Sequence, residues 1–243
     1  MVVRLTLGEE RSTIEEEIQR LWRENLEENK MEEKKPCLSC VDCHVYHCHY
    51  QDSKYPEFCL TTNMNPDTYK RAMDALKSEE DNRIAVAAAQ VEYEGYGKRT
   101  RVEEVIQFAK KLGVKKIGIA TCLGLIEESR TLTKILRLNG FEVYGVVCKC
   151  GATLKTEIGI PSECDAVGAN MCNPVLQAEL LNDAQTELNL IMGLCVGHDS
   201  LFIKHANALC TNVVTKDRVL AHNPAAALYT SNMYYQRLFD KQD

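Results

Sequence analysis

The sequence has no long apolar run and no excess of basic charge. No stretch approaches the roughly 18 to 20 apolar residues that span a bilayer, and the amino-terminal residues are too acidic for a secretory signal. Lys and Arg total 29 against 35 Asp and Glu, which gives a formal net charge of −6. Nucleic acids and anionic membranes recruit basic surfaces, so we expect neither as a partner and predict a cytoplasmic protein.

Nucleotide-binding signatures and internal repeats are also missing. The sequence contains no Gly-x-Gly-x-x-Gly after the first predicted strand and no Gly-x4-Gly-Lys-Ser/Thr, so we predict no nucleotide cofactor. With 243 residues, 45% of them hydrophobic, the chain can bury a core of its own. This length suits one domain with an appended module.

Cysteine, in contrast, is abundant, and the chain contains twelve. In a reducing cytoplasm, many cysteines indicate metal or redox chemistry before disulfides. A single buried cysteine can also be a small core residue. The positions of the cysteines therefore decide between these interpretations.

The chain divides into three predicted parts. Residues 1–35 form an acidic amphipathic extension whose helix, 12–35, begins at a capping box of Ser12 and Glu15 and carries an apolar stripe suited to packing or to a homodimer. Residues 36–65 are a cysteine-rich metal or cluster module with few aliphatic side chains, and residues 66–243 alternate between helix and strand patterns.

The last part predicts an α/β fold with a doubly wound, mostly parallel sheet flanked by helices. Short continuous apolar runs such as KKIGIA and LNLIMGL are typical of strands covered on both faces. The predicted strands are 83–91, 115–121, 141–147, 187–194 and 210–215, and the predicted helices are 66–80, 100–112, 125–139, 174–185, 199–207 and 223–240.

The first cysteine set lies in the module 36–65, at positions 37, 40, 43, 48 and 59. Thiolates two residues apart can reach one ion or cluster, whose binding supplies folding energy to a segment without a core. The opening spacing resembles that of bacterial ferredoxins and favours a [4Fe–4S] cluster. Zinc remains an alternative cofactor at this site. His44, His47 and His49 are then either zinc ligands or solvent-facing neighbours.

The second set is scattered in sequence but gathered by the predicted fold. Cys122, Cys148 and Cys195 each follow a predicted strand, and Cys172 precedes the expected cap Asn173 of helix 174–185. Doubly wound sheets place their sites at this carboxyl edge, where helix N-termini lower thiol pKa values. Four thiols could hold a [4Fe–4S] cluster, and three would leave one iron open to substrate. One alternative is that these four cysteines are independent core residues. Another is that Cys150, rather than Cys148, belongs to the set.

Three candidate catalytic residues lie near the same edge. His198 is a candidate proton donor. Asp217 and Arg218, together with Lys216, follow the last predicted strand, where a cation could offset thiolate charge or bind an anionic substrate.

Several strings in the chain resemble an uncharacterised prokaryotic cysteine-rich family whose members are labelled metal-binding proteins. The most specific are GLCVGHDSLF and KDRVLAHNP, and the similarity covers roughly residues 40–230. The resemblance implies amino-terminal metal ligands at Cys40, Cys43, Cys48 and Cys59, with Cys37 as an extra thiol. The sequence also resembles the family pattern at Cys122, Cys148, Cys172 and Cys195. The family supplies no reaction.

Three functional hypotheses follow, and whether the protein is an enzyme stays open. The preferred one is an iron–sulfur protein with two cysteine-ligated sites, acting in electron transfer or in reduction or desulfuration of a small substrate, with an electron donor protein as partner. The alternative is a zinc-binding structural or regulatory protein without redox activity. A third is a thiol enzyme with Cys122 or Cys195 as nucleophile and His198 or His222 as base.

Overall fold

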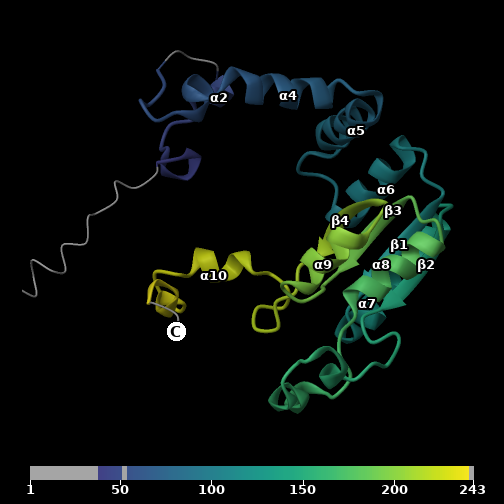
Figure 1. Cartoon of the computed structure of the whole chain (residues 1–243). Helices are drawn as coiled ribbons and strands as arrows, with labels where there is room; N and C mark the ends of the chain where they lie inside the picture. Colours follow the sequence, from purple (N-terminus) through teal and green to yellow (C-terminus); the bar gives the residue numbers. More distant parts are fainter. Residues whose placement is uncertain (1–37, 51–53, 241–243) are drawn as a thin grey trace, which may run out of the picture. The chain divides into compact units, whose positions relative to one another are not determined.

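The computed structural model describes residues 38–50 and 54–240 (Figure 1). Cys37 and the helix expected at 12–35 lie outside the described residues. The chain divides after Asp74 into two units, Met1–Asp74 and Ala75–Asp243, and each is described by itself.

The first unit is built from short elements without a buried side chain. They are the 3-10 turn η1 (Cys40–Asp42) and the helices α2 (His47–Tyr50), α3 (Leu60–Asn63) and α4 (Pro66–Leu76), the last of which runs across the boundary between the units. The helix α4 begins with Pro66, as predicted, because proline suits the first helical turn. None of these four elements contains a buried residue, so apolar burial does not explain how the segment folds.

The second unit contains a four-stranded sheet in the order β2-β1-β3-β4, in which every neighbouring pair is parallel. The strands are β1 (Lys116–Thr121), β2 (Glu142–Val147), β3 (Leu188–Met192) and β4 (Leu209–Val214). All residues of β3 are buried, as the continuous apolar run predicted. The α/β fold with a parallel sheet flanked by helices is confirmed.

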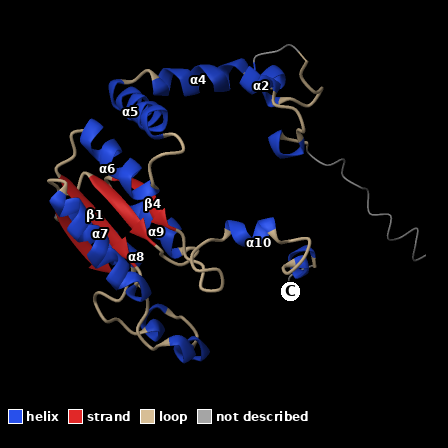
Figure 2. Cartoon of the chain, turned by 180° about the vertical axis from the view of Figure 1, so that it is seen from behind, coloured by secondary structure: helices blue, strands red, loops and turns tan. Residues whose placement is uncertain are grey.

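Helices cover both faces of this sheet (Figures 1 and 2). One core joins Ile117 and Ile119 of β1 to the helices α5 (Glu79–Gly95), α6 (Arg101–Lys111) and α7 (Ile126–Leu138). The other core joins Ala120 to the helices α8 (Pro174–Asp183) and α9 (His198–His205). Successive residues of β1 thus serve opposite cores, which is the arrangement of a doubly wound sheet.

The expectation of a strand at 83–91 is wrong, because these residues lie within α5. Ser78 caps this helix by accepting a hydrogen bond from Asp81 N–H at 3.3 Å. Ala87 and Val91 are buried at a helical spacing of four residues, and Ile84 packs against the same core. A short apolar run can belong to a buried helix as well as to a strand, and here the helix forms.

The prediction of a single helix at 223–240 is also wrong. The structure has α10 (Ala225–Tyr229) followed by the separate 3-10 turn η5 (Gln236–Phe239). The hydroxyls of Thr230 and Ser231 donate to the carbonyls of Ala226 and Leu228 at the end of α10. Such side-chain hydrogen bonds compete with the backbone hydrogen bonds of the helix and favour its early termination.

The connection from β2 to α8 contains two more 3-10 turns, η3 (Lys155–Ile158) and η4 (Ser162–Val167). Among the described residues, no helix is long and apolar enough to cross a membrane.

Candidate metal centre

The direction of the sheet connections reverses between β1 and β3. From β1 the chain passes through α7 to β2 on one side, and from β3 it passes through α9 to β4 on the other. In open α/β sheets, the crevice beyond the carboxyl ends of the strands at such a point is the usual ligand site. Cys122 follows β1 directly and Cys195 follows β3 after two residues, so both lie at this carboxyl edge of the sheet.

Cys122 is held between the two central strands. Its backbone N–H donates to Met192 O of β3 at 3.1 Å. The Gly124 N–H and the Lys216 ammonium group both act on its sulfur and lower the pKa of the thiol. A Cβ atom at Gly124 would lie 3.9 Å from both Cys122 Sγ and Lys216 Nζ, which shows how closely the backbone approaches this pair.

Cys148 is the middle thiol of three. It is only 3% exposed, and its sulfur accepts a hydrogen bond from Leu123 N–H at 3.4 Å. Cys122 and Cys172 pack against the core that contains Cys148, and both act on its pKa. Its carbonyl accepts from Asn173 N–H at 2.8 Å, which ties the start of α8 to the end of β2. The structure therefore brings Cys122, Cys148 and Cys172 together.

The three thiols have unequal pKa values. The hydrogen bond from Cys148, followed by Gly124 N–H and Lys216, lowers the pKa of Cys122 to about 4 despite burial. The same donor, with the charges of Lys149 and His198, lowers the pKa of Cys172 to about 5. The two thiolates raise the pKa of Cys148, which stays protonated. The expected lowering thus occurs at Cys122 and Cys172, but its main cause is the shared thiol rather than a helix end.

Cys195 approaches the site from β3. Arg218 Nη2 donates a hydrogen bond to its sulfur at 3.0 Å, and this bond raises the pKa of Arg218. The charges of Cys122 and Cys172 also raise the pKa of Arg218. The carbonyl of Cys195 accepts from His198 N–H at 2.9 Å and starts α9.

The loop after β4 supplies two of the cations at the site. Lys216 contacts Cys122 and Arg218 contacts Cys195. The carboxylate of Asp217 instead accepts from the Val219 and Leu220 N–H groups at 2.9 and 2.8 Å. Asp217 N–H also donates to His222 Nδ1 at 3.2 Å. Asp217 and His222 therefore hold the loop in shape.

Sequence reasoning missed Gln177 on the inner face of α8. The residue is fully buried, and its Nε2 donates to Val146 O at 2.7 Å and to Thr121 O at 3.2 Å. It joins the ends of β1 and β2 directly before Cys122 and Cys148. A polar residue between the apolar Val175 and Ala178 of a predicted helix was the available signal. The cap Asn173 was predicted, and it accepts from Leu176 N–H at 2.8 Å.

The remaining cysteines of this unit have other surroundings. Burial raises the pKa of Cys210, which lies near the start of β4. Cys164 is exposed on η4. Cys150 packs against the core of α8 and α9, but the thiol hydrogen-bonded to both Cys122 and Cys172 is that of Cys148.

The amino-terminal unit has a thiol-lined cavity of its own, of about 120 Å³. Ten residues line it, among them Tyr46, Phe58 and all four expected ligands: Cys40, Cys43, Cys48 and Cys59. None of the candidate histidines is among the lining residues. Burial raises the pKa of Cys59, but hydrogen bonds from Thr61 and Thr62 outweigh this effect and lower it. Hydrogen bonds within the segment also fix Cys43, whose sulfur donates to Val45 O at 3.0 Å.

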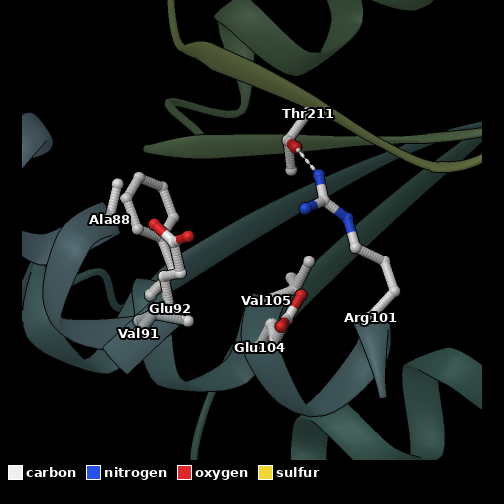
Figure 3. Close-up of a pocket in the computed structure, with 8 residues that line it drawn as sticks. Ala88, Val91, Glu92, Arg101, Glu104, Val105 and Thr211 are labelled. Atoms are coloured by element: carbon white, nitrogen blue, oxygen red, sulfur yellow. Dashed lines mark hydrogen bonds between the residues drawn. The ribbon is translucent and has the colours of Figure 1, made fainter. Parts of the chain in front are cut away.

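A larger cavity of about 340 Å³ lies between α5, α6 and β4 (Figure 3). Its walls are mostly apolar, with Glu92, Glu104 and Arg101 at its polar positions. Figure 3 shows Arg101 reaching across it to Thr211, to whose hydroxyl it donates at 2.7 Å. No thiol lines this cavity, so its chemistry is separate from that of the sheet edge.

Two comparisons connect the chain to known sequences. The family described as "Protein of unknown function (DUF1847)" matches residues 59–213. The chain belongs to this family. The relative named "Uncharacterized protein MJ0455", from Methanocaldococcus jannaschii, is 44% identical over 185 residues, which cover 76% of this chain and 95% of the relative. The resemblance to an uncharacterised family seen in the sequence is confirmed.

The DUF1847 match begins at Cys59 and ends before the cationic loop that follows β4. It includes the four cysteines of the sheet edge, whereas Cys40, Cys43 and Cys48 precede it.

Proposed function

We propose that this DUF1847 protein is an iron–sulfur protein with two cysteine-ligated [4Fe–4S] sites, acting in electron transfer or in reduction or desulfuration of a small substrate. The outer site is formed by Cys40, Cys43, Cys48 and Cys59, and the inner site by Cys122, Cys148, Cys172 and Cys195. The observation that carries the proposal is the packing of Cys122 and Cys172 against the core that contains Cys148, at the edge where Cys195 follows β3.

The residues at the inner site fit a cluster in their chemistry. Soft thiolates select iron–sulfur clusters, zinc or Cu(I). The Leu123 N–H already donates to the sulfur of Cys148, and such hydrogen bonds help set the reduction potential of a cluster. Lys149, Lys216 and Arg218 offset the negative charge that thiolates bring.

Metal binding would require the thiols to rearrange their hydrogen bonds. In residues 38–50 and 54–240, no three Cys, His, Asp or Glu side chains stand as a group that could hold a metal ion. Cys148 must lose its proton, because the thiolate is the ligand. Its bonds to Cys122 and Cys172 would then be exchanged for bonds to metal. A bound cluster would supply one-electron redox chemistry. We propose His198 as the proton donor, because its charge lowers the pKa of Cys172.

Metal and sulfide analysis tests the proposal. The protein is purified anaerobically, and iron, zinc and acid-labile sulfide are measured per chain for the wild type, Cys195→Ala and the control Cys164→Ala. We expect about eight iron and eight sulfide, with about half lost in Cys195→Ala and none in the control, whose thiol lies on the exposed turn η4. One or two zinc without sulfide would contradict the redox function and support the zinc-binding alternative.

A further inference from the structure

A cavity of about 380 Å³ lies between α7 and the strands β1 and β2. Ile119, Ile126 and Val147 give it apolar walls. Proteins bind small molecules in cavities of roughly 300 to 1,000 Å³, so the space is large enough for one. No cysteine is among the described residues that line it, and the inference drawn from it therefore does not depend on the proposed function.

Gly145 of β2 lines this cavity without a side chain. It pairs in register with Ile119 of β1, and a Cβ atom placed on it would meet only that residue, at 3.9 Å. The pairing of β1 with β2 runs without a bulge, and Gly145 is not among the glycines with positive φ. Neither crowding nor backbone geometry therefore requires glycine here. A glycine inside a strand often marks a place where a ligand approaches the backbone, and this reason remains for Gly145.

The charged residues that line the cavity are all cations. Arg130, Lys134 and Arg137 recur along one stripe of α7, at i, i+4 and i+7, and no Asp or Glu is among the described lining residues. Glu127, which does not line the cavity, pairs with Arg130. Arg137 donates to Val143 O at 3.4 Å, which ties its guanidinium group to β2 two residues before Gly145. The three cations are exposed, so a ligand can reach them from solution.

The hydroxyl groups of the cavity already donate their hydrogens within the protein. Ser129 donates to the Thr121 hydroxyl at 2.7 Å, and Thr121 donates to Cys122 O at 3.0 Å. The Thr133 hydroxyl donates to Ser129 O at 2.8 Å. The cations are therefore the donors left for a ligand, and ammonium and guanidinium groups form their strongest hydrogen bonds with carboxylate or phosphate oxygens.

We propose that this cavity binds a small organic anion, with an apolar ring against Gly145 and a carboxylate or phosphate group at the cations of α7. A flat ring suits the space because the space opens where one side chain is missing. An anion without an apolar part would leave the walls of the cavity uncovered, and an uncharged ring would leave the cations without an acceptor. Because the whole chain has a net charge of −6, its surface elsewhere tends to repel such an anion.

Calorimetric titration of the full chain at low ionic strength tests the inference. The probes are 2-naphthoate and 2-naphthyl phosphate, with neutral 2-naphthalenemethanol and the small anion acetate for comparison. We expect one equivalent of an aromatic anion to bind, and the alcohol and acetate to bind at least about tenfold more weakly. Gly145→Val, whose side chain fills the space, should weaken binding of the aromatic anion by at least about tenfold. Lys134→Gln should weaken it by about five- to tenfold.

Each variant has a matched control. Tyr144→Val places the same valine at the neighbouring position of β2, whose side chain lies on the opposite face of the sheet. Lys204→Gln removes the same charge from α9, which packs against that opposite face. Both controls should keep the affinity of the wild type, and circular dichroism checks that all four variants are folded.

Three results would overturn the inference. They are the absence of binding by either aromatic anion, equal affinity for the uncharged alcohol, and an unchanged affinity in Lys134→Gln. The last result is decisive even if Gly145→Val folds poorly, because Lys134 is exposed on α7 and its replacement leaves the core intact. The metal and sulfide content of the protein is measured separately, so failure here leaves the proposed function standing.

Discussion

The two cysteine sets occupy parts of the molecule that fold for different reasons. Around the outer set, no helix or 3-10 turn from η1 to α4 has a buried residue, and Cys40 and Cys48 are exposed. Around the inner set, β3 is buried throughout and Cys148 is 3% exposed. The difference implies that metal would organise the outer segment, whereas the sheet organises the inner thiols before any metal arrives.

Removal of metal should produce the largest difference between the two parts of the molecule. We expect a chelator under reducing, anaerobic conditions to unfold η1, α2 and α3 and to leave the sheet folded. Structural metal contributes about 10 to 16 kcal/mol in zinc-finger peptides, far more than this coreless segment can replace. Hydrogen exchange followed by mass spectrometry would show protection lost in α2 and α3 and kept in β1 and β3. Unchanged protection in α2 and α3 would contradict the proposed role of the metal.

A core substitution should have the reverse effect. Leu190 is 0% exposed at the centre of β3, and Leu190→Ala is expected to lower the free energy of unfolding of the α/β unit by about 2 to 5 kcal/mol. Leu138 is 88% exposed at the end of α7, so Leu138→Ala should change stability by no more than about 0.5 kcal/mol. Thermal unfolding by circular dichroism measures both. Metal bound at the outer site should be unaffected, and its loss in Leu190→Ala would show that the two parts fold as one.

The inner thiols should already be charged in metal-free protein. The pKa values of about 4 for Cys122 and about 5 for Cys172 mean that both are thiolates above pH 6 and are protonated only as the pH falls through those values. Their alkylation by iodoacetamide should therefore change little between pH 6 and 8. An ordinary thiol such as glutathione accelerates about a hundredfold over this range. Peptide mass spectrometry at both pH values checks this, and acceleration parallel to that of glutathione would contradict it.

Much of the inner site was predictable because it follows from strand ends. The four strands that form were recognised from short apolar runs, and three of them, β1, β2 and β3, placed a following cysteine at one edge. The run at 83–91 failed because its apolar residues suit a buried helix equally well. The contact of Arg218 with Cys195 could not be predicted from the sequence. It depends on a loop in which Ala221 and His222 adopt positive φ values of 49° and 64°. Such values are uncommon outside glycine and leave no reliable mark on a sequence.

The smallest test compares two helix caps. Asn173 caps α8 and lies beside Cys172, whereas Ser78 caps α5, which packs against the opposite face of the sheet. Replacing either residue by alanine should reduce stability by about 1 kcal/mol, because each cap satisfies one backbone N–H. Only Asn173→Ala should also change the alkylation rate of Cys172, since this cap begins the helix that carries the thiol into the site. Equal rates in both variants would show that Cys172 is held by its thiol and lysine contacts alone, without help from the start of α8.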